Sequence, residues 1–410
     1  MERALIPHLF RTEFNRIVAV LCRQAGSMHL QAAEDIAADT FMAAVETWPY
    51  RGIPANPAGW LQQVAKNKAI NYFRRDAIYG RKIRPALAAT PAFTEPDTAW
   101  TEDYIADSQL RMMFALCHPA VPVLAQVTLC LRILCGFSVP EISDALLNST
   151  DAIHKQLQRA RQTLRSEQIG LELPPAGVLA SRLDKVLLTL YLLFSEGYYS
   201  ERNHQVILQE LCAEAMRLTR QLADHPLTQV PATKALLALM CFQASRLQAR
   251  KGGDGELVFY HQQDRSAWNP ALISRGASLL NEASGGDVLS RFHLEASIAW
   301  WLCCDGAEDL RWKNILALHD LLLQHFYSPV AALNRLYALS RVHGREAALA
   351  EAVDGRLPRG HFYYVLLAEL HAGVDDRKAG ECYRRALTLA KSDTDRETIT
   401  GRLAALGEPA

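Results

Sequence analysis

Three stretches of the chain carry residue types suited to binding charged polymers, and the first of them is acidic. Between residues 31 and 50 the charged side chains are the carboxylates of Glu34, Asp35, Asp39 and Glu46, with no Lys or Arg. Helical spacing would place Glu34, Asp35 and Asp39 on one exposed face, where they could bind a basic partner surface. They lack the neighbouring His or Lys of an acid–base pair, so they do not predict catalysis. An ordinary solvated helix face is the alternative.

The second stretch, residues 60–84, interleaves aromatic and basic side chains with amides. Seven Lys or Arg residues stand there against the single acid Asp76. Aromatic rings stack on unpaired bases and cations neutralise phosphates, so this composition suits single-stranded or melted DNA. The residues concerned are Trp60, Gln62, Gln63, Lys66, Asn67, Lys68, Asn71, Tyr72, Phe73, Arg74 and Arg75. The alternative is that the aromatic side chains belong to a helical core and that the basic ones only solubilise it.

The third stretch, residues 137–165, predicts two helices joined by a tight turn. Ser138 and Glu141 stand three residues apart, as a capping box at the start of a helix requires. The hydroxyl of Ser149 or of Thr150 can cap the second helix after the turn. The sequence therefore predicts both where the two helices begin and where the chain reverses between them.

The second helix of this pair has one apolar and one basic face. Its predicted buried stripe, at spacings of four, three and four residues, consists of Ile153, Leu157, Ala160 and Leu164. The opposite face carries His154, Lys155, Gln158, Arg159, Arg161 and Gln162. A short capped helix, a turn and a basic helix are typical of a helix-turn-helix, whose second helix can enter a DNA major groove. A helical hairpin with a solvated charged face is the alternative.

Length and composition restrict the class of protein. The chain has 410 residues, of which 50% are hydrophobic and 21% charged, enough apolar material for two to four domains. A formal net charge of zero argues against a protein that coats nucleic acid non-specifically. No apolar run is long enough to cross a membrane, and the N-terminus lacks the apolar core of a signal peptide. The nine scattered cysteines contain no Cys-x-x-Cys pair, which favours free thiols in a reducing cytosol. We therefore expect a cytoplasmic protein without membrane contact.

Proline-containing breaks divide the chain. Residues 81–108 contain Pro85, Pro91 and Pro96 among acidic side chains and show little periodicity, which predicts an extended linker. After residue 175 the apolar positions recur at helical spacing, and no segment alternates as a strand does. Near the end, a tetratricopeptide-type helical hairpin is indicated by Tyr363, Leu366, Leu370, Ala379, Tyr383 and Ala386. The predicted fold class is all-α.

The order of these segments resembles an extracytoplasmic-function sigma factor of the sigma-70 family. AAEDIAADTFMAAVETWP is similar to the polymerase-binding helix of that family, and NPAGWLQQVAKNKAINYFRRD to its promoter-melting helix. VPEISDALLNSTDAIHKQLQRARQTLR is similar to its helix-turn-helix. Further segments, including LLTLYLLFSEGYYS and QDRSAWN, resemble the long C-terminal extension of one sigma-factor group, which ends in tetratricopeptide-like helices.

This resemblance implies a domain order and a set of binding residues. Residues 1–80 would form region 2, 81–108 the linker, 109–170 the region 4 helix-turn-helix, and 175–410 a helical extension with a regulatory role. Docking on the β′ clamp helices of RNA polymerase is implied for Glu34, Asp35 and Asp39. Contacts to the promoter −10 element are implied for Trp60, Gln63, Lys66, Asn67, Asn71 and Arg74. Contacts in or beside the −35 major groove are implied for Thr150, Asp151, His154, Lys155, Gln158, Arg159 and Arg161.

The function implied by the resemblance is promoter-specific initiation rather than catalysis. The expected partners are core RNA polymerase, through the β′ clamp helices and the β flap, and promoter DNA. No metal or organic cofactor is expected. The extension would regulate activity through an intramolecular, protein or peptide contact, or would only stabilise the fold. The alternatives are a helical-repeat scaffold protein and a stand-alone helix-turn-helix regulator that never joins polymerase.

Overall fold

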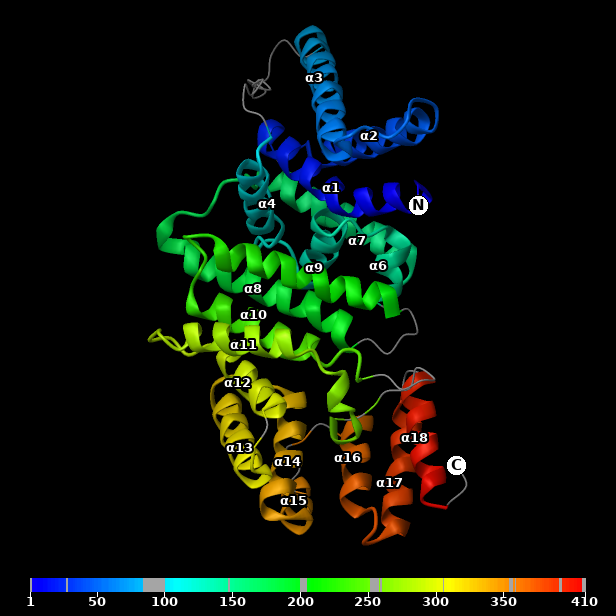
Figure 1. Cartoon of the computed structure of the whole chain (residues 1–410), viewed down its shortest axis with the longest axis vertical. Helices are drawn as coiled ribbons and strands as arrows, with labels where there is room; N and C mark the ends of the chain where they lie inside the picture. Colours follow the sequence, from blue (N-terminus) through cyan, green and yellow to red (C-terminus); the bar gives the residue numbers. More distant parts are fainter. Residues whose placement is uncertain are drawn as a thin grey trace. The chain divides into compact units, whose positions relative to one another are not determined.

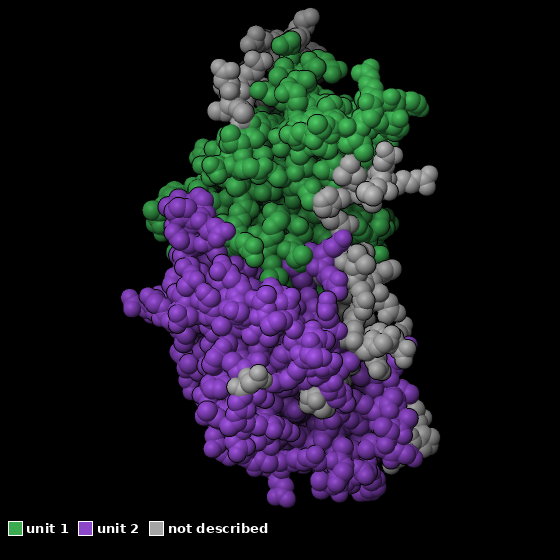
Figure 2. Space-filling model, viewed as in Figure 1, with its two compact units in different colours: residues 1–197, 213–222 green, residues 198–212, 223–410 purple. Residues whose placement is uncertain are grey.

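The structure is a computed structural model in which every regular element of the described residues is a helix (Figure 1). The described residues are 2–26, 29–83, 100–146, 148–199, 205–250, 258, 260–304, 306–353, 357, 359–390 and 393–407. No β-strand occurs among them, which confirms the all-α fold class. The chain forms two compact units, the first from residues 1–197 with 213–222 and the second from residues 198–212 with 223–410 (Figure 2).

The first unit begins with three long helices. These are α1 (Glu2–Ala25), α2 (Leu30–Arg51) and α3 (Pro57–Ile83). Helix α1 packs against both of the others and against the next helix, so its Ile17 and Leu21 have no exposed surface. Burial of apolar side chains on several faces of one helix makes α1 the central element of this unit.

Helix α4 (Glu102–Leu116) begins inside the segment predicted as linker. The Thr101 hydroxyl accepts a hydrogen bond from the Tyr104 amide, and Glu102 and Asp103 place negative charge at the positive end of the helix dipole. These local signals start the helix before residue 108, so the linker is shorter at its C-terminal end than the sequence predicts. The prolines of the predicted linker, at positions 85, 91 and 96, lie outside the described residues.

The helix-turn-helix is formed as its capping signals predict. Helix α5 (Val123–Leu129) continues into one π-helical turn (Cys130–Leu134), after which come α6 (Val139–Ala145) and α7 (Thr150–Ser166). The Ser138–Glu141 capping box starts α6, and the Ser149 hydroxyl caps α7 by accepting from the Ala152 amide. The predicted stripe on α7 is buried, namely Ile153, Leu157, Ala160 and Leu164.

The next two helices bond to α4 to α7, residues 102–166, which are called the helix-turn-helix segment below. In α8 (Ala176–Tyr199), Arg182 donates to the Phe114 carbonyl at 2.5 Å and Thr189 donates to the Gln126 side chain at 2.9 Å. In α9 (Gln205–Asp224), Gln221 donates to the Ala106 carbonyl at 2.5 Å. The chain beyond residue 175 therefore contributes α8 and residues 213–222 to the first unit.

The second unit consists of further helices packed mainly on their neighbours in sequence. They are α10 (Pro231–Ala244), α11 (Pro270–Ala283), α12 (Arg291–Cys303), α13 (Glu308–His325), α14 (Pro329–His343), α15 (Arg345–Ala352), α16 (His361–His371), α17 (Asp376–Leu389) and α18 (Asp393–Ala405). Helices α10 and α11 approach closely at Gly276, where a Cβ atom would lie only 2.8 Å from the Phe242 ring. A residue larger than Gly would therefore force this pair apart.

The predicted C-terminal hairpin is the pair α16 and α17. Tyr363 and Leu370 of α16 and Ala379, Tyr383 and Ala386 of α17 are buried, while Leu366 is half-buried. The Tyr383 hydroxyl donates to Glu369 at 2.5 Å, and Arg402 of α18 pairs with the same carboxylate. The helix spacing read from the sequence is thus confirmed for this pair.

All nine cysteines are free, and seven of them are buried. In the first unit the Cys117 and Cys130 sulfur atoms lie 3.9 Å apart, and burial raises the pKa of the Cys22 and Cys135 thiols. Buried thiols of this kind behave as small apolar side chains and react slowly, because the thiolate is disfavoured. Among the described residues, no helix has the length and apolar character needed to span a membrane.

The buried histidine of α13 predicts an acid-sensitive second unit. Burial lowers the pKa of His319 to about 4, opposed by Asp320 and reinforced by Arg335. A His in the unfolded chain has a pKa near 6.5, so between pH 6.5 and pH 4 the unfolded state binds a proton at this residue and the folded state does not. We expect the free energy of unfolding to be highest above pH 6.5 and to fall by about 3 kcal/mol as the pH drops to 4.

Urea unfolding followed by circular dichroism at pH 7.5 and pH 4.5 measures this loss. His319→Leu removes the titrating group and should flatten the pH dependence, whereas His325→Leu, which changes an exposed residue of the same helix, should keep it. Equal pH dependence in His319→Leu and in the unsubstituted protein would contradict the prediction.

Candidate functional site

The acidic residues of α2 separate onto two faces of the helix. Asp35 and Asp39 are exposed one turn apart, as predicted, but Glu34 is only 4% exposed. The expectation that all three share an exposed face is therefore wrong. Adjacent residues on a helix point about 100° apart, and Glu34 falls on the buried stripe with Ala37 and Phe41, three and seven residues later.

The exposed face of α2 combines acidic and apolar side chains. The row of Asp35, Asp39, Met42 and Glu46 follows helical spacing, and the neighbouring Val45 is also exposed. Met42 and Val45 keep about half of their surface in solvent, at 55% and 45%. Apolar side chains bordered by carboxylates suit a basic protein surface that also offers apolar contact area.

Glu34 makes ion pairs with the helix-turn-helix segment. Its carboxylate lies 2.7 Å from Nη2 of Arg161 in α7 and 3.4 Å from Nε of Arg132 in the π-helical turn. Burial raises the pKa of Glu34, while the two guanidinium groups pull it down without restoring its usual value. The ion pairs therefore only partly offset the cost of removing the carboxylate from water.

The predicted −10 residues of α3 form one exposed row and one packed group. Gln63, Asn67, Asn71 and Arg74 are exposed at spacings of four, four and three residues, and Gln63 donates to Asn67 at 3.1 Å. The predicted residues Trp60 and Lys66 are half-buried. The exposed row presents amides that can read base edges and a cation that can hold a phosphate.

The aromatic side chains near α3 divide between core and surface. Phe73 is buried, and Trp60 packs edge-to-face on Trp48 of α2 with ring centroids 5.4 Å apart. Tyr72 is exposed, and Tyr50 at the end of α2 keeps 90% of its surface in solvent. Phe73 and Trp60 therefore belong to the helical core, whereas Tyr72 is exposed and can stack on a base. Tyr50 was missed in the sequence because it lies outside the basic stretch.

The predicted −35 residues lie on α7, and one of them points away from solvent. Thr150, Asp151, His154, Lys155, Gln158 and Arg159 are exposed. Arg161 is half-buried, and its guanidinium faces Glu34 of α2. The expectation that Arg161 shares the open basic face is therefore wrong for this conformation. Arg161 stands three residues after Gln158 and on nearly the same side of α7, but its guanidinium is taken up by Glu34 of α2.

Comparison with known proteins identifies the family. Residues 9–77, which span most of α1 to α3, match the family described as Sigma-70 region 2. The chain belongs to the sigma-70 family. It carries a large C-terminal extension, an arrangement consistent with an extracytoplasmic-function-like sigma factor, and residues 182–284 of that extension match a family of unknown function, DUF6596.

The similarity extends over nearly the whole sigma factor. The chain is 32% identical over 393 residues to uncharacterized protein R00370 of Rhizobium meliloti (strain 1021). The matched residues cover 93% of this chain and 92% of that protein. No solved structure matches the chain. Membership of the sigma-70 family gives the protein a sigma-factor-type role in transcription, in a family of non-enzymatic proteins whose general partners are RNA polymerase and promoter DNA.

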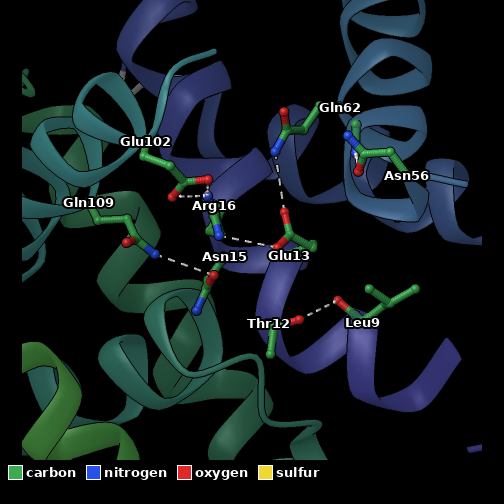
Figure 3. A network of polar contacts seen from close by, with 10 residues as sticks. Leu9, Thr12, Glu13, Asn15, Arg16, Asn56, Gln62, Glu102 and Gln109 are labelled. Atoms are coloured by element: carbon green, nitrogen blue, oxygen red, sulfur yellow. Dashed lines mark hydrogen bonds and ion pairs between the residues drawn. The ribbon is translucent and has the colours of Figure 1, made fainter. Parts of the chain in front are cut away.

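A polar network in this sigma factor joins α1 to the helices on either side (Figure 3). The buried Glu13 carboxylate accepts from Gln62 of α3 at 3.4 Å, and Arg16 pairs with Glu102 of α4 at 2.5 Å. The buried Asn15 accepts from Gln109 of α4 at 3.3 Å. These contacts fix the region 2 helices to the start of the helix-turn-helix segment.

Asn15 also reaches the π-helical turn. Its amide donates to the Leu134 carbonyl at 2.5 Å, and Arg217 of α9 donates to the same oxygen at 3.3 Å. The last carbonyls of a helix have no partner within it, so Leu134 can accept from both. No signal in the sequence indicates that Asn15 bonds to Leu134 or that Arg132 pairs with Glu34, because each partner lies far away in the chain.

Proposed function

We propose that the protein binds core RNA polymerase and directs it to promoters through separate contacts to a −10 and a −35 element. The observation that carries this proposal is the exposed polar row of α3, Gln63, Asn67, Asn71 and Arg74, on a helix covered by the Sigma-70 region 2 match. From Gln63 to Arg74 a helix rises about 16 Å, the length of roughly five nucleotides at about 3.4 Å each. The row is thus long enough to follow a short melted segment.

The acidic and apolar face of α2 is the proposed polymerase contact. Asp35 and Asp39 would pair with basic side chains of the β′ clamp helices, and Met42 and Val45 would supply apolar contact area. Glu34 would join them only after it leaves Arg161 and Arg132. Exposed charges of this kind act mainly on the rate and orientation of association.

The exposed side of α7 is the proposed −35 contact. Lys155 and Arg159 would hold phosphates, and His154 and Gln158 would face base edges. The extension, including residues 182–284, would modulate this activity, because α8 and part of α9 are bonded to the helix-turn-helix segment. A tetratricopeptide-like array in the C-terminal part would offer a surface for a further partner.

The decisive experiment combines core-polymerase pull-down with run-off transcription. A sigma factor is retained on core polymerase and starts transcription at a defined promoter. A stand-alone regulator would bind duplex DNA without being retained on polymerase, and a scaffold protein would do neither. Absence of both core binding and initiation at every promoter tested would refute the proposal.

Loss of the α3 amides should impair melting more than binding. Asn67→Ala with Asn71→Ala removes two groups that would contact unpaired bases, each worth about 1–3 kcal/mol, so run-off transcription from a duplex promoter should fall at least about tenfold. On a template already mismatched across the −10 element the variant should regain most of its activity, because the bases there are unpaired before the protein binds.

Two further variants serve as controls for this prediction. Gln324→Ala removes an exposed amide of α13, a helix of the second unit with no predicted DNA contact, and should transcribe both templates normally. Lys155→Ala should weaken both templates equally, because it acts on the upstream contact. If the Asn67 and Asn71 double variant lost the same activity on both templates, its residues would have no role in melting.

A further inference from the structure

Two buried thiols of the helix-turn-helix segment lie in contact with each other. The sulfur atoms of Cys117 and Cys130 are 3.9 Å apart, and both side chains are at most 1% exposed. The sulfur atoms of a disulfide are about 2.05 Å apart, so they would have to approach by roughly 2 Å. Rotation about the two Cα–Cβ bonds with a small backbone movement can supply this shift. The two free thiols are therefore placed to form a disulfide.

Hydrogen bonds hold the turn that joins α4 to α5, between the two thiols. The side-chain amide of Gln126 donates to the carbonyl oxygens of His118 at 3.1 Å and of Val121 at 2.8 Å. Its side-chain oxygen accepts from Thr189 of α8 at 2.9 Å. Because these bonds fix the path of the chain between the two helices, they keep the two sulfur atoms at contact distance.

The two thiols differ in how a solute can reach them. Cys117 is the C-cap residue of α4 and is followed by a turn in which Pro119 and Ala120 are exposed. Cys130 lies inside a continuous helix, where α5 passes into the π-helical turn. Exposed turns open locally more readily than helix interiors do. A small solute would therefore reach Cys117 first.

The environment of Cys117 favours an ionised sulfur. Arg182 of α8 donates to the Phe114 carbonyl at 2.5 Å, one turn before Cys117. Burial lowers the pKa of Arg182, and the Cys117 sulfur opposes that effect, which shows that the guanidinium lies near it. The Nε–H of Arg182 is buried and makes no hydrogen bond within the part of the chain that is described. A neighbouring cation with a donor to offer stabilises a thiolate.

Cys130 is the thiol that keeps its proton. Its hydrogen bond with Cys117, followed by burial, raises the pKa of Cys130 well above the usual value. The Cys130 thiol can therefore donate to an ionised Cys117 sulfur. Burial alone would make both thiols slow to react, but the nearby cation and the exposed turn distinguish Cys117 from a purely structural cysteine. A reactive thiol beside a resolving one is the arrangement of a redox-sensitive pair.

We propose that Cys117 and Cys130 form a peroxide-oxidised modification site in the helix-turn-helix segment. The Cys117 thiolate attacks one oxygen of hydrogen peroxide, so that an S–O bond forms while the O–O bond breaks. The leaving hydroxide takes up the proton that Cys117 released and becomes water. The Cys130 sulfur then attacks the sulfur of the Cys117 sulfenic acid, and the S–S bond forms as hydroxide leaves with the Cys130 proton. The two thiols lose two electrons, and the peroxide becomes two molecules of water.

Mass spectrometry of the full-length protein after exposure to hydrogen peroxide tests the site. Trypsin releases residues 112–132 as one peptide that contains both Cys117 and Cys130. After the remaining thiols are alkylated, this peptide should be two hydrogens lighter and unmodified at both positions. It should change before Cys241 of α10, which is also 1% exposed. Dithiothreitol should return both thiols.

Single substitutions separate the roles of the two thiols. In Cys130→Ser, oxidation of Cys117 should stop at the sulfenic acid, which dimedone traps. In Cys117→Ser, Cys130 should stay reduced at a peroxide concentration that oxidises the unsubstituted protein. Circular dichroism of each variant checks that the helices remain, and the unsubstituted protein supplies the main result without any variant.

The guanidinium of Arg182 should set the rate of oxidation. Arg182→Met should form the disulfide at least threefold more slowly, whereas Arg182→Lys, which keeps the positive charge, should recover most of the rate. Lys185→Met is the matched control, because it removes an exposed cation of the same helix, and it should react as the unsubstituted protein does.

Each other outcome overturns a named part of the proposal. If residues 112–132 keep both thiols after the half-buried Cys382 is fully oxidised, there is no such site. A disulfide from Cys130 to Cys135 would appear as a crosslink to a different tryptic peptide and would overturn the assignment of Cys117. Equal rates in Arg182→Met and the unsubstituted protein would remove the role of the cation. These results do not depend on polymerase binding, so they stand apart from the proposed function.

Discussion

Reversing the two exposed charges of α2, by Asp35→Arg with Asp39→Arg, should lower the affinity for core polymerase about 100-fold. Both carboxylates would change from attraction to repulsion toward a basic surface, and like charges brought together at an interface cost several kcal/mol. A loss of about 2.8 kcal/mol already corresponds to 100-fold. The fold should persist, because both side chains are exposed and the hydrogen bond that Asp35 accepts from Gln31 is itself at the surface.

Equilibrium binding of the labelled protein to core polymerase, measured by anisotropy, checks this effect. Asp184→Arg is the control, since it reverses an exposed charge on α8, a helix outside the proposed polymerase contact. Its affinity should change by less than about threefold. Normal polymerase binding by the Asp35 and Asp39 variant would remove α2 from the proposed interface.

The second large effect concerns where the chain can be shortened. A chain that ends after Gln168 should not fold cooperatively, whereas one that ends after Asp224 should. In α8, Val186, Leu190 and Leu193 have no exposed surface and lie on the same side as Thr189, which bonds to Gln126. Losing α8 and α9 removes several such side chains, each worth about 1.5–3 kcal/mol. That sum is comparable to the whole stability of a domain, about 5–15 kcal/mol.

Thermal unfolding by circular dichroism distinguishes the two shortened chains. The longer one should melt in a single cooperative transition, and the shorter one should lose helix gradually and aggregate. A sharp transition of the shorter chain at the temperature of the longer one would show that α8 and α9 contribute little to the first unit. A transcription test of the extension is therefore meaningful only with the longer chain.

Local signals in the sequence predicted local structure well. The capping box at Ser138 and the hydroxyl cap at Ser149 depend on residues within three positions of each other, and both form. The buried stripe of α7 and the C-terminal helix pair depend on helical periodicity, which a single sequence contains in full. Each of these features is decided by neighbours in the chain, so no knowledge of the tertiary fold was required.

Contacts over long sequence separations could not be read in the same way. Glu34 was placed with Asp35 on one face because their charges match, but its partner Arg161 lies 127 residues away. Likewise, the break at Pro174 and Pro175 suggests a domain limit, yet α8 belongs to the first compact unit. The predicted polymerase and promoter contacts themselves remain predictions, because they depend on molecules outside the chain.

The buried free thiols can report local opening of the helices around them. Cys22 lies close enough to Glu34 for that carboxylate to raise the pKa of the thiol beyond the effect of burial. Cys135 follows Leu134, and its pKa, raised by burial, is raised further by Glu214 and lowered by Arg217 of α9. Both thiols are buried, and Cys241, buried in α10 of the second unit, supplies an internal reference. In a brief alkylation pulse, the ratio of modification at Cys22 and Cys135 to that at Cys241 would therefore report how often the first unit opens locally around these residues in the unlabelled, unsubstituted protein.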